Sequence, residues 1–266
     1  MTTLAETFHE LHRTAKPLRL PNAWDVGSAR LMESLGAEAV ATTSAGVAWA
    51  LGHPDGDRLP PREAARIAAA MTRVIKIPLS IDFEGGYSDD PAAVGEHIKP
   101  VLDAGAVGIN IEDGSAPPER LAAKIERIRR VAAGQGVALF INARTDVYLR
   151  GLKPEAERVA EVIARAARYR DAGTDGLFVP GLIDPAQIRA IVEATPLPVN
   201  LLAWPGLPPA AELAALGVRR LSAGSGIAQS LWGRAATLAK GFLEDGASGP
   251  LGEGAMSFAE INRLFP

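Results

Sequence analysis

The sequence from residue 79 to residue 114 reads LSIDFEGGYSDDPAAVGEHIKPVLDAGAVGINIEDG. It contains two short apolar runs, Leu79–Asp82 and Val107–Ile111, which are almost continuously hydrophobic, as strands of a parallel sheet buried on both faces are. Between them, Pro91–Ala104 has helical spacing and begins with proline, a residue favoured in the first turn of a helix. This stretch therefore predicts a strand–helix–strand unit of an α/β protein.

The same unit recurs on both sides of this stretch. Eight strands followed by helices in roughly 250 residues are typical of a (β/α)₈ TIM barrel, which we expect for residues 1–245. A doubly wound sheet is disfavoured because the chain has neither G-x-G-x-x-G nor G-x-x-x-x-G-K-[ST]. The other predicted strands are Leu18–Leu20, Ala39–Thr42, Leu139–Arg144, Gly176–Val179, Val199–Leu202 and Arg220–Ala223, and the other predicted helices are Pro61–Val74, Glu119–Ala133, Glu155–Ala172, Asp184–Ala194 and Gly226–Phe242.

The C-terminal tail departs from this repeat. Asp245–Gly254 is rich in glycine, and Met256–Phe265 returns to an amphipathic pattern. Residues 246–266 are therefore predicted to form a flexible connector and a C-terminal helix. Two placements stay open: the helix packs on a neighbouring subunit, or it folds back on its own barrel.

Composition excludes several classes of function. The 266 residues are 47% hydrophobic, carry a formal net charge of −3 and include no cysteine. Thiolate metal sites, disulfides and thiol nucleophiles are therefore excluded. The charge balance argues against a nucleic-acid partner. Because the chain shows neither a run of about 18 apolar residues nor a secretory leader, we expect no membrane span and a cytoplasmic location.

Acidic side chains gather at the predicted strand ends. Asp82 and Glu84 end one strand, Glu112 ends the next, and Asp55 lies in the loop after the second strand. Adjacent strands lie about 4.8 Å apart, so these carboxylates are expected at one rim of the barrel. Either one of them is protonated or a cation lies among them. An all-oxygen cluster favours Mg²⁺ first and Mn²⁺ second.

Two further features of this rim suit an anionic ligand. Arg144 ends the strand Leu139–Arg144, where a guanidinium could bind a carboxylate or phosphonate bidentately or could form a structural pair with Glu112. The small residues of Ala41–Gly46 could form a backbone nest for a carboxylate, or only a tight turn.

These motifs together resemble the isocitrate lyase/phosphoenolpyruvate mutase superfamily, with matches from about residue 17 to residue 245. The resemblance implies a (β/α)₈ barrel, a homotetramer with exchanged C-terminal helices, and Mg²⁺-dependent binding of 2-oxo or 2-hydroxy carboxylic acids. The matching segments are Pro21–Asp25, Ser28–Arg30, Thr43–Gly46, Gly52–Asp55, Ser80–Tyr87, Gly108–Gly114 and Asn142–Asp146.

The resemblance also assigns roles to residues of this chain. Asp82, Glu84 and Glu112 are expected to hold the metal, partly through water. Catalytic roles fall to Arg144, which would meet the oxo group or a second acid group, and to Glu112 and Asp55. Trp24, as a pocket wall, and Asn200 on Val199–Leu202 are also predicted to contact substrate. The residues expected at the substrate carboxylate are Ser44, Ala45 and Gly46.

This chain departs from the superfamily at two positions that carry chemistry. Lyases place a cysteine-containing loop after the acidic residues that follow the strand Val107–Ile111, but here Gly114–Arg120 lacks cysteine. Gly181 stands where lyases have glutamate and phosphonomutases have histidine. Cleavage through an enolate needs less acid–base help. We therefore predict Mg²⁺-dependent C–C cleavage of a small 2-oxo or 2-hydroxy di- or tricarboxylic acid, similar to oxaloacetate or methylisocitrate.

Three alternatives stay open. The first is a phosphonomutase or hydrolase that acts on the P–C bond of phosphonopyruvate or carboxyphosphonoenolpyruvate. The second is a binding protein for 2-oxo acids without catalysis. The third is an unrelated barrel in which the acidic residues are structural.

Overall fold

Nine parallel strands form a nearly closed barrel in the computed structural model, which describes residues 2–265. The strands neighbour one another in the order β1-β9-β8-β7-β6-β5-β4-β3-β2, so the predicted barrel architecture is confirmed. Their bounds are β1 Leu18–Leu20, β2 Asn22–Ala23, β3 Val40–Thr42, β4 Leu79–Asp82, β5 Gly108–Glu112, β6 Phe140–Arg144, β7 Gly176–Phe178, β8 Val199–Leu202 and β9 Arg220–Ser222.

The barrel closes at Pro21, between two short strands. β1 pairs with β9, whereas β2 pairs with β3. Proline has no amide hydrogen and so cannot donate to a sheet ladder, which interrupts the strand at this point. The sequence predicted only Leu18–Leu20 here. β2 contributes two residues and no apolar run, so periodicity could not reveal it.

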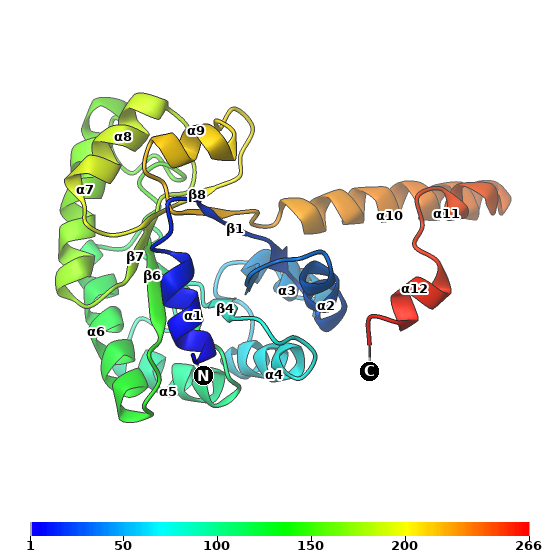
Figure 1. Cartoon of the computed structure of the whole chain (residues 1–266), viewed down its shortest axis with the longest axis horizontal. Helices are drawn as coiled ribbons and strands as arrows, with labels where there is room; N and C mark the ends of the chain where they lie inside the picture. Colours follow the sequence, from blue (N-terminus) through cyan, green and yellow to red (C-terminus); the bar gives the residue numbers. More distant parts are fainter. Residues whose placement is uncertain (1, 266) are drawn as a thin grey trace.

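Helices surround the barrel as predicted (Figure 1). The six predicted helices end within three residues of the observed bounds, and the structure adds several short ones. The bounds are α1 Leu4–Leu11, α2 Val26–Ser34, α3 Ser44–Ala50, α4 Pro61–Thr72, α5 Pro91–Asp103, α6 Pro118–Gly134, α7 Glu155–Asp171, α8 Pro185–Ala194, α9 Ala210–Ala215, α10 Gly226–Asp245, α11 Gly249–Gly252 and α12 Phe258–Asn262.

Helix α1 covers the amino-terminal ends of the strands. Phe8 is fully buried, and its ring packs edge-on against Phe140, with 5.5 Å between the ring centroids. His12, at the end of α1, stacks on the same ring at 3.9 Å. This apolar plug separates that end of the barrel from the opposite end, where the predicted site residues lie.

Helix α10 extends away from the barrel (Figure 1). Ala228 is its single buried residue within the described chain. After α11 the chain turns back, and the carbonyl of Leu264 accepts a hydrogen bond from Arg30 Nε on α2 at 2.6 Å. No helix among residues 2–265 is long and apolar enough to span a membrane.

Candidate active site

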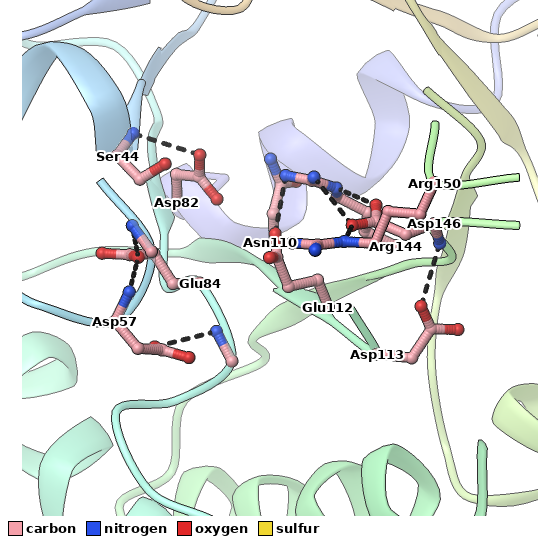
Figure 2. Close-up of polar contacts among 12 residues, drawn as sticks. Ser44, Asp57, Asp82, Glu84, Asn110, Glu112, Asp113, Arg144, Asp146 and Arg150 are labelled. Atoms are coloured by element: carbon pink, nitrogen blue, oxygen red, sulfur yellow. Dashed lines mark hydrogen bonds and ion pairs between the residues drawn. The ribbon is translucent and has the colours of Figure 1, made fainter. Parts of the chain in front are cut away.

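Strand register sets the order of the side chains at the carboxyl end of the barrel. Asp82 on β4 is in register with Asn110 on β5, and Glu112 on β5 is in register with Arg144 on β6. The predicted residues therefore come from three adjacent strands. Figure 2 shows them in two groups, with Asp82 and Glu84 in one and Glu112 and Arg144 in the other.

Asp82 is fixed by the neighbouring β3–α3 segment. Its Oδ2 accepts a hydrogen bond from the Ser44 amide at 3.1 Å, and its own amide donates to Thr42 Oγ1 at 2.8 Å. Burial raises the pKa of the Asp82 carboxyl and Asp55 adds to this, while Arg144 and Ser44 lower it. The Ser44 amide, which was expected to receive substrate, therefore donates to a protein carboxylate in this structure.

Glu84 is held by a loop that the sequence analysis did not single out. Its Oε2 accepts from the amides of Gly56, at 3.0 Å, and Asp57. Asp57 also links its loop to the segment after Glu84, because its Oδ1 accepts hydrogen bonds from the amides of Gly85 and Tyr87, both at 3.1 Å. Burial raises the pKa of Glu84 to about 7, and Asp82, Asp57 and Asp55 contribute repulsion.

Arg144 is clamped between two carboxylates. Its Nη1 lies 2.6 Å from Glu112 Oε2, and its Nε lies 2.7 Å from Asp146 Oδ1. Asp146 is fully buried and also accepts from Arg150 Nε at 2.8 Å. Burial raises the pKa of Glu112 to about 8, although the attraction of Arg144 lowers it. Repulsion from Asp146 and Asp82 also raises this pKa. Burial lowers the pKa of Arg144, but the negative charges of Glu112 and Asp146 outweigh this effect, so the pKa is raised.

Behind Arg144, a second network holds the strand end. The amide of Asp146 donates to Asp113 Oδ1 at 2.9 Å. Asp113 Oδ2 in turn accepts from Arg165 Nη1 at 2.7 Å and from the Tyr169 hydroxyl at 2.6 Å. Asp113 is adjacent to Glu112 in the chain but, by strand alternation, belongs to the opposite face of the sheet. It therefore supports the loop that carries Asp146.

A cavity of about 180 Å³ opens between these groups. Of the predicted residues, Ser44, Ala45, Asp55, Asp82 and Arg144 line it. Its other lining residues are Asn22, Thr43, Asn110, Leu149, Phe178, Pro180, Leu202, Trp204, Ser222, Gly224 and Ser225.

Three predicted substrate residues lie outside this lining. A Cβ on Gly46 would lie 2.8 Å from both Trp24 Cβ and Thr43 Cγ2, so glycine is needed for the packing of Trp24. Asn200 Oδ1 accepts from the Ser222 hydroxyl at 3.2 Å, and Ser222 rather than Asn200 reaches the cavity.

The acidic residues suit a hard divalent cation in their donor chemistry. Asp82, Glu84 and Glu112 offer only oxygen, and burial with mutual repulsion raises the pKa of each. Glu84 Oε1 is buried and has no hydrogen-bond partner. Among residues 2–265, however, no three acidic or histidine side chains are already grouped as a metal site. Glu84 is turned to the Gly56 loop and Glu112 to Arg144.

Gly181 brings two loops of the rim together, and its replacement by alanine is predicted to destabilise the fold. Its φ is +83°, and a Cβ would lie 3.1 Å from Leu149 N and 3.2 Å from Leu149 Cα. We expect Gly181→Ala to lower the free energy of unfolding by about 2–4 kcal/mol, measured by urea denaturation. Gly136→Ala is the matched control, because Gly136 has φ +69° and open space around its Cβ position. Equal losses in the two variants would contradict a close approach at Gly181.

The fold and site together define a (β/α)₈-type barrel protein with an acidic mouth and an arginine, Arg144, that lines the cavity there. The phosphoenolpyruvate phosphomutase family model matches residues 8–243, and the chain belongs to that family. An uncharacterized protein of Mycobacterium tuberculosis H37Rv is 42% identical over 223 residues, which are 82% of each chain. An oxaloacetate decarboxylase of Bradyrhizobium sp. BTAi1 is 32% identical over 68% of this chain and 64% of its own.

Solved structures agree with this membership. A candidate phosphonomutase from Burkholderia cenocepacia J2315 has a TM-score of 0.84 and 40% sequence identity, with 89% of this chain and 98% of that chain covered. The predicted superfamily resemblance is therefore confirmed. Relatives are named as an oxaloacetate decarboxylase, a probable 2-methylisocitrate lyase and a candidate phosphonomutase, which supports an enzyme of the broad lyase or mutase kind.

Proposed function

We propose that this protein is a divalent-metal-dependent lyase that cleaves a C–C bond of a small 2-oxo or 2-hydroxy di- or tricarboxylic acid, such as oxaloacetate or a methylisocitrate-like acid. The proposal rests on one observation: Arg144 lines a small cavity together with Asp82 and pairs with Glu112, and the pKa of both of these carboxyl groups is raised. The named decarboxylase relative supports the same reaction class.

Each side chain has a role in this proposal. Asp82, Glu84 and Glu112 would hold Mg²⁺ or Mn²⁺, in part through water. When bound, such an ion polarises the oxo group of the substrate as a Lewis acid. With a 2-oxo acid, Arg144 binds a substrate oxygen and, when the C–C bond breaks, stabilises the charge as the bonding pair moves onto the 2-oxo oxygen. For oxaloacetate, carbon dioxide leaves and a proton from water returns to the carbon, which gives pyruvate.

The test is product formation from oxaloacetate and a panel of related acids, with Mg²⁺ added and then removed by a chelator. We expect turnover that requires the metal and falls at least a hundredfold in Glu112→Gln and Asp82→Ala. Full turnover in either variant would refute the scheme.

A P–C bond reaction is the second candidate, because the candidate phosphonomutase is 40% identical. Phosphorus NMR of reactions with phosphonopyruvate would detect it. In either reaction Arg144 is the single basic residue in the described lining, so in this one it would have to bind the phosphonate.

We further propose that α10–α12 exchange with a second copy in a homotetramer. Trp232, Phe242 and Leu243 on α10 are more than half exposed. On the barrel, an apolar groove of about 530 Å³ lies beside β1 and β9, where a helix after the last strand of a TIM barrel would pack. This groove is lined in part by Leu20, Met32, Leu35, Ala203, Leu221 and Ile227.

This assembly predicts a defined change in mass. Light scattering should give four times the 27.9 kDa of one chain. Trp232→Asp on α10 and Leu35→Asp in the groove should each reduce the mass, because each buries a charge at the contact. Leu4→Asp, at an exposed position of α1, is the control and should leave the mass unchanged. A monomeric wild-type protein would exclude the exchange.

A further inference from the structure

The lining of the cavity at the barrel mouth changes in chemistry around the barrel. Its polar and charged side chains come from the ends of β2, β3, β4, β5 and β9, from the loop that carries Asp55, and from Arg144 at the end of β6. Its large apolar side chains come from the ends of β7 and β8 and from the loops after β6, β7 and β8: Leu149, Phe178, Pro180, Leu202 and Trp204. Nothing in the proposed cleavage uses this apolar wall, so it needs a separate explanation.

One part of the wall is positioned by a close backbone contact. The loop after β6 carries Leu149, and its main chain lies against Gly181, where a Cβ would be 3.1 Å from Leu149 N. A side chain at position 181 would therefore collide with this loop. Gly181 thus allows the loop to approach, and Leu149 lines the cavity from that loop.

A charged substrate group on this side would find no cation. Arg144 is the single basic residue among the described lining residues, and its guanidinium already faces Glu112 and Asp146. A carboxylate buried against leucine, phenylalanine and tryptophan without a partner is unfavourable. A methyl or ethyl group in the same place is removed from water at no such cost.

We propose that the apolar wall recognises a hydrocarbon substituent on C3, the carbon next to the 2-oxo group, so that the preferred substrates are 3-alkyl acids and not oxaloacetate itself. This inference rests on the proposed function and specifies its substrate class. The carboxylate and oxo group lie at the polar side, and the alkyl group contacts Leu149, Leu202 and Trp204.

Calorimetric titrations with Mg²⁺ present test the wall directly. Pyruvate, 2-oxobutanoate and 2-oxopentanoate differ by one methylene each at C3. We expect the affinity to rise about fourfold per methylene, the factor that corresponds to about 0.8 kcal/mol per buried CH₂. In turnover, 3-methyloxaloacetate should exceed oxaloacetate in kcat/KM by a similar factor. A kcat/KM for 3-methyloxaloacetate equal to or below that for oxaloacetate, together with a flat affinity series, would overturn the inference.

Two variants test whether the rise in affinity along this series of 2-oxo acids comes from the apolar wall. Leu149 and Ile183 are both 38% exposed on adjacent loops, but Leu149 lines the cavity and Ile183 does not. Leu149→Ser should flatten the affinity gradient along the series, whereas Ile183→Ser should preserve it. An unchanged gradient in Leu149→Ser would refute the role of the wall.

Oxalate separates this inference from the proposed function. It has two carboxylates, no C3 and no alkyl group, so its Mg²⁺-dependent binding reports on the acidic residues and Arg144 alone. If oxalate binds and the alkyl series shows no gradient, the wall inference fails and the lyase proposal stands. If neither oxalate nor any oxo acid binds with Mg²⁺, both fail.

Discussion

Replacing Arg144 by lysine is expected to lower kcat/KM for the proposed cleavage about 10²–10³-fold while the fold persists. The guanidinium contacts Glu112 through Nη1, at 2.6 Å, and Asp146 through Nε, at 2.7 Å, and Nη2, at 3.2 Å. A lysine ammonium is a compact point charge and cannot keep these directions together while it faces substrate. The positive charge is retained, so the buried carboxylate of Asp146 is not left without any cation.

Arg150→Lys is the matched control for this measurement. Arg150 also donates through Nε to Asp146, at 2.8 Å, but its side chain is half exposed and it is not among the residues that line the cavity. We expect kcat/KM of this variant within a few-fold of wild type. Steady-state kinetics on both variants, with circular dichroism to verify folding, decides the point. If both variants lose activity equally, the effect comes from Asp146 and the strand end and not from contact with substrate.

The strands could be predicted because parallel strands buried on both faces are almost purely apolar. Eight segments of that kind recovered β1 and β3–β9 within one residue of their bounds. Several elements that the sequence did not predict are too short to show a period: β2 has two residues, and α3 and α9 have seven and six. Helix α1 was not predicted for another reason. It packs on the barrel through the contact between Phe8 and Phe140, which are far apart in the chain.

The candidate site was predictable in part, because alternation along a strand gives the side of a residue but not its depth. Asp82 and Arg144 were expected at the rim and line the cavity. Asn200 shares the inward side, yet it bonds to Ser222 and lies outside the lining. Asp57 could not be found from strand periodicity, because it lies in a loop with φ of +57° and acts through backbone amides of Gly85 and Tyr87.

Acid is expected to destabilise the protein through His12, at the end of the barrel opposite the site. Its side chain is 4% exposed, and Nδ1, assigned as the protonated nitrogen, donates to the Phe8 carbonyl at 2.7 Å. Burial, with smaller contributions from the charges of Arg220 on β9 and His9 on α1, lowers the pKa of His12 from 6.5 to about 3. The folded state therefore holds His12 neutral at a pH where the unfolded chain binds a proton.

The sign of the effect follows from that difference. The native pKa is below the unfolded value, so this contribution is fully present above pH 6.5 and is lost as the pH falls toward about 3. The loss should reach up to about 1.4 kcal/mol per pH unit in that window. Urea denaturation at pH 7.5, 6, 5 and 4 measures it. His12→Asn keeps an amide donor for the Phe8 carbonyl and cannot titrate. The slope of its unfolding free energy against pH should therefore be shallower than that of wild type, by up to the contribution of one proton.

His97→Asn provides the control for the loss of one imidazole. His97 on α5 also bonds a backbone carbonyl through Nδ1, that of Gly86 at 3.0 Å, but it is only half-buried. Its variant shows how much of a change in slope follows from the loss of any imidazole that bonds a backbone carbonyl. The slope, and not the stability at one pH, is the informative quantity, because any substitution in the Phe8–Phe140 plug also changes packing. Parallel slopes for wild type and His12→Asn would assign the acid sensitivity to other groups, such as the carboxylates at the barrel mouth.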